Sequence, residues 1–269
     1  MSEEKVSLSQ PLPVPQDFVV PTDIVPLPSE GKVYPQGHPF CGARGVEIRS
    51  MTAREEDILT SRALLRSNRA VSMLLKACIV DKTVDVDKLL NGDRNAILIG
   101  IRITGYGPEY NTAIKCPACE EEVKRTIDLR ELPVKNFPAD AQPTSPGKNE
   151  FEFNLPRLNK KVMFRLMTGE DDKELIAYAE ASRKQGIVEE LITTRHKLMI
   201  QSIGGETDKG KLAITIRSMP ASDSRAFRKY VDKITPGVEL TMPFVCGACG
   251  QETKEVEVPL GSEFFWPKS

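Results

Sequence analysis

The spacing of hydrophobic residues in the first half of the chain predicts helices flanked by short strands. Apolar residues recur at helical intervals after residue 52 and again after residue 91, and Thr52-Ala53-Arg54-Glu55 has the form of a capping box at a helix start. Gly105-Tyr106-Gly107 predicts the end of the last of these helices. Residues 46–48 predict a strand, and residues 110–115 and 123–129 predict a β-hairpin.

The second half repeats this order of elements. Strands are predicted at residues 151–154 and 161–166, followed by a helix that opens at Thr168-Gly169-Glu170-Asp171. Leu175, Ile176 and Ala179 are predicted to face inward from this helix. A longer helix is predicted over residues 187–203, another over 220–234, and a closing hairpin over 238–245 and 253–260. Helices therefore dominate, and the hairpins lie at the end of each half.

A direct comparison of the two halves supports an internal duplication. VEIRSMT at residues 46–52 aligns with VMFRLMT at 162–168, an offset of 116, and acidic residues follow in both copies. The offset reaches 130 at Asp93 and Asp223, so the second half carries about fourteen more residues, most of them around 204–211, where a loop is expected. The predicted fold is α+β, with two similar helical lobes.

Composition shifts predict the boundaries of these parts. Six prolines interrupt residues 1–30, which favours an extended arm that lies on a neighbouring surface. A stretch rich in Pro, Ser and Lys predicts a linker over 133–148. The predicted organisation is an arm at 1–30, a first lobe at 31–132, the linker, a second lobe at 149–260, and an aromatic tail at 261–269 with Phe264, Phe265 and Trp266. The tail is expected to dock either on a partner or on its own lobe.

Composition and charge narrow the functional classes. The 269-residue chain is 40% hydrophobic and 28% charged, as in a soluble globular protein, and its formal net charge is −1. This balance disfavours nonspecific binding to nucleic acid or an anionic membrane. No apolar stretch approaches the roughly 20 residues of a bilayer span, and the N-terminus lacks a secretory pattern. The expected compartment is a reducing cytosol, where paired cysteines favour metal binding over disulfides.

The strongest chemical signal is a pair of Cys-x-x-Cys motifs, here called knuckles. Cys116 and Cys119 form the first, Cys246 and Cys249 form the second, and 126 residues separate the two. Zinc takes four thiolates in a tetrahedron, and each knuckle supplies two of them. One structural zinc ion shared by both lobes is therefore predicted, in a zinc-ribbon-like site that clasps them together. Four thiolates leave no open ligand position for catalysis, and the pattern does not distinguish zinc from iron.

The knuckles allow two alternative interpretations, namely unconnected turns and a redox pair of the thioredoxin sort. The redox interpretation is disfavoured because each motif lies in a predicted hairpin and does not open a helix. Lys115, Lys124, Arg125 and Lys254 flank the knuckles and could offset their negative charge, or could be ordinary solvated residues. Cys78 is expected to be a buried, inert thiol.

The chain offers no catalytic or cofactor-binding constellation. The acidic clusters at 55–57 and 170–172 fall in the first turn of predicted helices, where carboxylates favour the helix dipole. His38 and His196 are the only imidazoles, and neither stands at ligand spacing from a cysteine pair. Gly100, Gly105 and Gly107 lack the Gly-Lys-Ser/Thr ending of a phosphate loop. No enzyme activity and no small-molecule substrate are predicted.

Four segments carry a resemblance to a known family. LPSEGKVYP at residues 27–35, MTAREEDIL at 51–59, LLNGDRNA at 89–96 and YGPEY at 106–110, followed by the first knuckle, resemble the T4-like bacteriophage baseplate proteins. The likeness is close over residues 27–130. It implies a structural or assembly role in the hub region of a contractile tail baseplate, other baseplate and tail proteins as partners, and a location in the virion after synthesis in the host cytoplasm.

Two alternatives to a structural baseplate subunit follow from these observations. The first is a transient assembly chaperone that is absent from the finished particle. The second is a zinc-ribbon protein that binds nucleic acid, which the knuckles favour and the near-zero charge disfavours.

Overall fold

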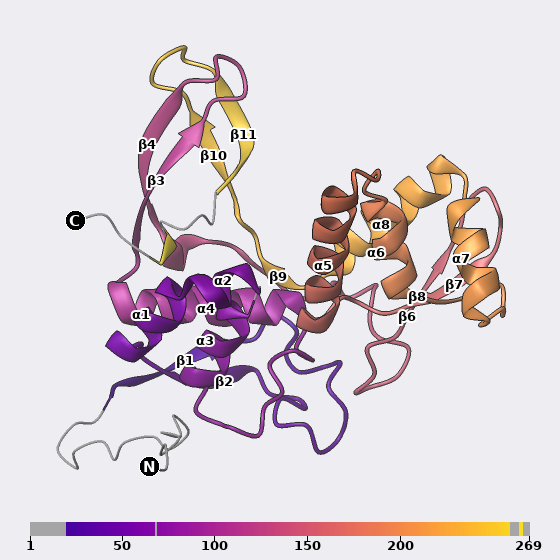
Figure 1. The fold of residues 1–269 in the computed structure, drawn as a ribbon, viewed down its shortest axis with the longest axis horizontal. Coiled ribbons are helices and arrows are strands. Elements are labelled where there is room, and N and C mark those ends of the chain that lie inside the picture. Colours follow the sequence, from indigo (N-terminus) through magenta and orange to yellow (C-terminus); the bar gives the residue numbers. More distant parts are fainter. Residues whose placement is uncertain (1–19, 68, 259–263, 266–269) are drawn as a thin grey trace, which may run out of the picture.

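The computed structural model describes residues 20–67, 69–258 and 264–265. Two helical lobes lie beside each other, and two β-hairpins rise together from the first lobe (Figure 1). The described residues contain both helices and strands in each lobe, which confirms the predicted α+β class. Among the described residues, no helix combines the length and apolar character needed to cross a bilayer.

The first lobe consists of a two-stranded sheet and four helices. Its elements are β1 (Thr22–Pro26), β2 (Gly45–Arg49), α1 (Ala53–Thr60), α2 (Arg62–Arg66), α3 (Ala70–Cys78) and α4 (Asn91–Tyr106). α1 starts at the predicted capping box, in which the Thr52 N–H donates to the Glu55 carboxylate at 3.0 Å. α4 ends where predicted, because Gly107 adopts a φ of 84°, which glycine reaches without strain.

The predicted arm boundary at residue 30 is wrong. β1 pairs antiparallel with β2, Val25 opposite Val46, and Leu27 is 2% exposed in the core. Ser29 is fully buried, and both its N–H and its hydroxyl donate to Asp93 at the start of α4. Proline tolerates an edge strand, so the apolar residues between the prolines can pack inward. Residues 1–19 of the predicted arm lie outside the described residues.

The predicted linker at residues 133–148 is packed structure and not a free spacer. After a 3₁₀ turn (Leu129–Glu131), β5 (Val134–Lys135) pairs with β9 (Gly237–Val238) from the end of the second lobe. Phe137 is 6% exposed and stacks on Phe151 with ring centroids 5.6 Å apart. The segment packs despite its loop-like composition, because burying its apolar side chains lowers the free energy more than leaving them in water.

The second lobe is a three-stranded sheet with four helices. Its elements are β6 (Phe151–Asn154), β7 (Lys161–Phe164), α5 (Gly169–Gln185), α6 (Leu191–Met199), β8 (Ile200–Ile203), α7 (Lys209–Arg217) and α8 (Ala221–Ile234). The sheet order is β6-β7-β8. The hairpins are β3 (Glu109–Lys115) with β4 (Glu122–Asp128), and β10 (Thr241–Val245) with β11 (Glu252–Glu257).

Two predictions for the second lobe are wrong. The helix predicted over 187–203 covers only 191–199, because residues 200–203 pair with β7 as β8, and this tertiary contact overrode the sequence periodicity. Ile176 is 41% exposed and does not face inward. The insertion around 204–211 begins as the expected loop over residues 204–208, and its last three residues form the first turn of α7, which Asp208 caps by accepting from the Lys211 N–H.

Several contacts recur at matching places in the two lobes. Arg49 pairs with Glu55 at the start of α1, and Arg165 pairs with Asp171 at the start of α5. Asp93 in α4 accepts from the Ser29 backbone N–H, just as Asp223 in α8 accepts from those of residues 157 and 158. Each aspartate is fully buried and holds the turn that follows the first strand of its lobe.

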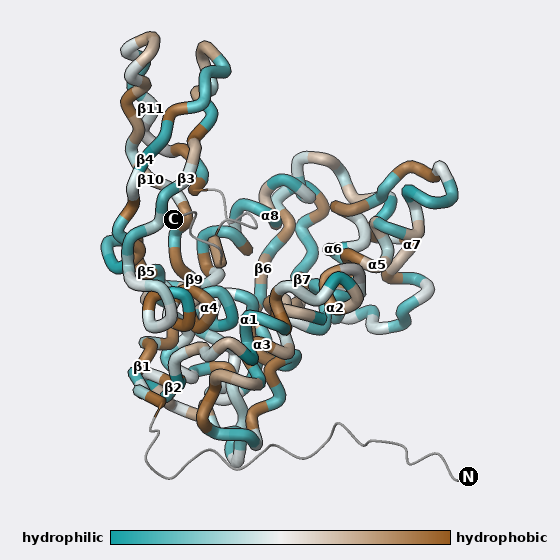
Figure 2. The backbone as a smooth tube through the Cα atoms, turned by 60° about the vertical axis from the view of Figure 1, so that its left-hand side comes forward, coloured by the Kyte–Doolittle hydropathy of each residue, from teal (hydrophilic) through white to brown (hydrophobic). Residues whose placement is uncertain are grey.

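The core is continuous across both lobes. One cluster of buried side chains runs from Val25 in β1 to Ile234 in α8, and a second cluster extends from the base of the hairpins to the knuckles at their tips. Figure 2 shows hydrophobic stretches in both lobes and along the hairpins. Gly92 lets the start of α4 lie close to the backbone that follows α8, because a Cβ at this position would lie 1.8 Å from the Pro236 carbonyl oxygen.

Candidate metal centre

Each knuckle is a tight turn at the tip of its hairpin. In the first, the Cys116 N–H donates to the Glu121 carbonyl and the Glu120 N–H donates to the Cys116 carbonyl, both at 2.9 Å. In the second, Cys246 and Gly250 make the same two bonds at 3.0 and 2.9 Å. The fifth residue of both turns has positive φ, 61° at Glu120 and 72° at Gly250. The backbone of the two knuckles is therefore closely alike.

The two hairpins stand side by side (Figures 1 and 2). Their four cysteines lie close together. All four Sγ atoms lie within 4.8 Å of one another. The Cys116–Cys249 and Cys119–Cys246 sulfur pairs are each 3.8 Å apart. Four sulfurs at about 2.3 Å from a tetrahedral zinc ion would lie about 3.8 Å apart. The donor set and its spacing fit a four-thiolate metal site.

The electrostatics of the cluster favour a cation. The backbone N–H groups of Cys119 and Ala118 point at the Cys116 sulfur and lower the pKa of Cys116 to about 7. The Glu121 N–H acts in the same direction on Cys119, but contacts with the neighbouring thiols and burial outweigh it and raise the pKa of Cys119 to about 12. Sulfurs this close repel one another once ionised, so a full set of thiolates needs a positive charge between them.

Of the flanking basic residues, Arg125 joins the two hairpins. Its guanidinium donates to the Val245 carbonyl at 2.6 Å and lies 5.7 Å from the centroid of the Phe244 ring. Lys115 instead pairs with Glu120 at 3.2 Å within its own hairpin. The side chain of Lys254 lies outside the described residues.

Arg102 at the base of the hairpins is a key residue that sequence reasoning missed. It is 1% exposed, and its guanidinium donates to the carbonyls of Phe264, Gly107 and Glu109 at 2.5, 2.7 and 3.0 Å. A charged residue is normally predicted to be exposed, so the sequence did not indicate that Arg102 is buried. The apolar residues around it in α4 were the one signal that could have suggested burial. All three acceptors lie where a chain enters or leaves the hairpins.

Phe264 and Phe265, the described residues of the predicted C-terminal tail, pack on the chain's own body. Phe264 is 2% exposed and meets Tyr110 edge to face, with ring centroids 5.3 Å apart. Phe265 packs against Phe264 in turn. The sequence left open whether the tail docks on a partner or on its own chain, and Phe264 and Phe265 pack on their own chain. Trp266 lies outside the described residues.

The remaining candidate residues have structural surroundings. Glu55 and Asp171 cap their helices, as expected from their place in the first turn. Cys78 is fully buried, which raises the pKa of its thiol to about 11, and Cys41 is exposed and apart from the cluster. His38 stacks on Tyr34 with ring centroids 4.6 Å apart.

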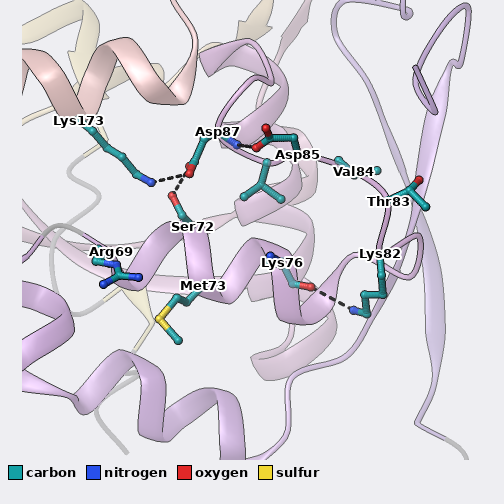
Figure 3. Close-up of a pocket in the computed structure, with 11 residues that line it drawn as sticks. Arg69, Ser72, Met73, Lys76, Lys82, Thr83, Val84, Asp85, Asp87 and Lys173 are labelled. Atoms are coloured by element: carbon teal, nitrogen blue, oxygen red, sulfur yellow. Dashed lines mark hydrogen bonds and ion pairs between the residues drawn. The ribbon is translucent and has the colours of Figure 1, made fainter. Parts of the chain in front are cut away.

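A polar pocket of about 570 Å³ beside α3 is lined by four basic and two acidic side chains, several of which are held by contacts within the protein (Figure 3). Asp87 accepts from Ser72 at 2.7 Å and from Lys173 of α5 at 2.6 Å. The Lys82 ammonium donates to three carbonyls at the end of α3. These contacts cap a helix and join the lobes.

The comparisons with known proteins agree with the resemblance seen in the sequence. Residues 21–147 match the family model described as T4 bacteriophage base plate protein. This range covers the first lobe, the first hairpin and the segment that leads into the second lobe, and it ends before the second knuckle. No curated protein and no solved structure matches the chain.

Proposed function

We propose that this chain, which matches the T4 bacteriophage base plate protein model over residues 21–147, is a structural subunit of the hub region of a contractile tail baseplate. The family match is the observation that carries the proposal. The role is non-enzymatic, and it depends on contacts with other baseplate and tail proteins within the virion. The continuous core across both lobes supports it, because a subunit of this kind must hold its binding surfaces in fixed positions.

Removal of the gene from the phage tests this function. Without the protein, particles should stop before the baseplate is complete, and a plasmid copy should restore them. Mass spectrometry of purified particles should then find the protein together with other tail proteins. Normal, infectious particles made without it would refute the proposal.

The same experiment separates a subunit from an assembly chaperone. A chaperone would be enriched in lysate assemblies and absent from purified particles. The nucleic-acid alternative predicts binding to DNA or RNA that weakens steeply with salt, and the net charge of −1 gives it little support.

We propose further that Cys116, Cys119, Cys246 and Cys249 bind one structural zinc ion. The 3.8 Å sulfur separations and the matching turns support this assignment. Since each hairpin supplies two ligands, the ion would clasp the ends of the two halves. Part of its binding free energy would then stabilise the fold.

Cys246→Ser tests the clasp, with Cys41→Ser as the matched control because Cys41 is exposed and outside the cluster. The wild type and the control should each carry one metal ion per chain by elemental analysis, which also identifies the metal. Cys246→Ser should lose the metal and melt at a lower temperature. Unchanged metal content and unchanged melting in Cys246→Ser would contradict the clasp.

An internal duplication accounts for the shared site. The repeated Arg–carboxylate pairs, the two buried aspartates and the two alike knuckles support it. In this account an ancestral lobe carried one knuckle and completed its metal site with a second copy. Expression of residues 20–132 alone would then give a chain that dimerises when zinc is added, and a monomer with or without zinc would count against it.

A further inference from the structure

A cavity of about 460 Å³ lies where the two lobes meet. The start of α4 and β5 line it on one side, and α6, α8 and β9 line it on the other. It is separate from the knuckles, which lie at the far tips of the hairpins (Figure 1). Its lining includes Asn91, Lys135, Arg195, His196 and Arg228.

His196 is the first sign that the cavity binds something. Its side chain is 2% exposed, and its Nε2 atom has no hydrogen-bond partner among the described residues. Asn91 lines the same cavity and is half-buried, and its Oδ1 atom also has no hydrogen-bond partner among the described residues. A buried polar atom without a partner costs about 1–3 kcal/mol. Two such atoms in one cavity are costly unless a ligand satisfies them.

The matching position in the first lobe shows that the fold does not need a histidine here. The Leu75 carbonyl accepts the N–H that ends α3, and the His196 carbonyl accepts the N–H that ends α6. Leu75 is fully buried and apolar. A leucine therefore suffices for packing at this place, and the imidazole adds a polar group that packing alone does not require.

The charges around the cavity favour an anion. Arg195 and Arg228 are exposed, and neither lies within ion-pair distance of a carboxylate among the described residues, although the charge of Asp172 acts on Arg195 at longer range. Burial, Arg228 and Arg195 together lower the pKa of His196 to about 4, so the imidazole is neutral at physiological pH. Neutral imidazole can still donate a hydrogen bond from Nε2. Asp232 and Glu239 also line the cavity, but Lys135 offsets part of their charge.

We propose that this cavity binds a small oxyanion, a phosphate or carboxylate group, between Arg195, Arg228 and His196. The guanidiniums supply charge-assisted hydrogen bonds, and the imidazole fixes the position of one oxygen. The bound anion would bridge α6 and α8 of the second lobe to the start of α4. The ligand would therefore steady the junction of the lobes, independently of the metal.

The chain contains only two histidines, which allows a direct test. Protein labelled with ¹³C and ¹⁵N at histidine should give two imidazole signals. On titration with inorganic phosphate at constant ionic strength, the His196 signal should move and saturate, while the His38 signal stays in place. Succinate in place of phosphate distinguishes a carboxylate site from a phosphate site. Arg195→Gln with Arg228→Gln should weaken the affinity at least about tenfold.

Arg225→Gln is the matched control, because Arg225 is an exposed arginine on the same helix as Arg228 and does not line the cavity. It should bind as the wild type does. His196→Leu should remain folded and bind more weakly by calorimetry. The proposal is overturned if neither anion moves the His196 signal, if both histidines move together without saturation, or if Arg225→Gln weakens binding as much as the double variant does.

Discussion

Glu55→Gln should destabilise the protein by removing one negative charge from the first lobe. Glu55 is 1% exposed, and its carboxylate accepts from Arg49 at 2.7 and 3.0 Å. It also accepts from the Thr52 N–H at 3.0 Å and the Thr52 hydroxyl at 2.7 Å. Glutamine keeps the shape of the side chain, but its NH₂ group replaces one carboxylate oxygen. This NH₂ group would then face the N–H or O–H donors of Arg49 and Thr52 and could not accept from them.

The pKa of Glu55 gives the size of the effect. Burial alone would raise this pKa, but the bonds from Arg49 and Thr52 outweigh burial and lower it from 4.5 to about 2. That difference corresponds to about 3 kcal/mol of preference for the carboxylate at neutral pH. Arg49 is 26% exposed, so solvent screens part of the pair. We expect Glu55→Gln to lower the free energy of unfolding by about 2–3 kcal/mol.

Urea unfolding at a series of pH values measures this loss. Because the folded-state pKa lies below the unfolded one, the stabilisation is complete above pH 4.5 and is lost as the pH falls towards 2. The difference between the wild type and Glu55→Gln should therefore shrink over that range. Glu47→Gln, at an exposed glutamate of β2, should change little. A loss below about 1 kcal/mol at pH 7, or a difference that stays constant with pH, would refute the reasoning.

Three further predictions follow from the junctions of the fold. Gly92→Ala should destabilise the protein by at least about 1–3 kcal/mol in urea unfolding, since its Cβ would lie 1.8 Å from the Pro236 oxygen; wild-type stability would show that the lobes separate easily. Phe264→Ala should cost about 3–5 kcal/mol because the ring is 2% exposed, and a loss under about 1 kcal/mol would mean that the tail is undocked in solution. The free energy of unfolding of the wild type should fall by up to about 3 kcal/mol as the pH falls from 6.5 to 4. Over this range the histidine of the unfolded chain becomes protonated, whereas buried His196 stays neutral in the folded protein. His196→Leu should lack this loss, and an equal loss in that variant would assign it to another group.

The repeated Arg–carboxylate pairs connect these predictions to the proposed duplication. Arg165 and Asp171 in the second lobe reproduce the bidentate contact, with both distances at 2.6 Å. Burial opposes ionisation of Asp171, but Arg165 and Thr168 outweigh it and lower its pKa. Both pairs tie the second strand of a lobe to its first long helix, so damage to either pair should loosen the same joint in its own lobe.

Local signals in the sequence determined much of this protein. The capping boxes at Thr52 and Thr168 and the stop at Gly107 act within a few residues, so the sequence contains all the groups that decide them. The two knuckles belong to the same class of signal. Their residue type and spacing predicted that four cysteines would meet, and the structure brings them together.

The tertiary structure alone decided the features that depend on distant partners. Residues 200–203 continue a helical pattern, yet they become β8 because β7 offers an open edge. Arg102 is buried because three carbonyls from the hairpins and the tail converge on it. The cavity at His196 exists only where the two lobes touch. Periodicity describes which face of an element is apolar, but the partner that covers this face comes from elsewhere in the chain, and burial against that partner sets the outcome.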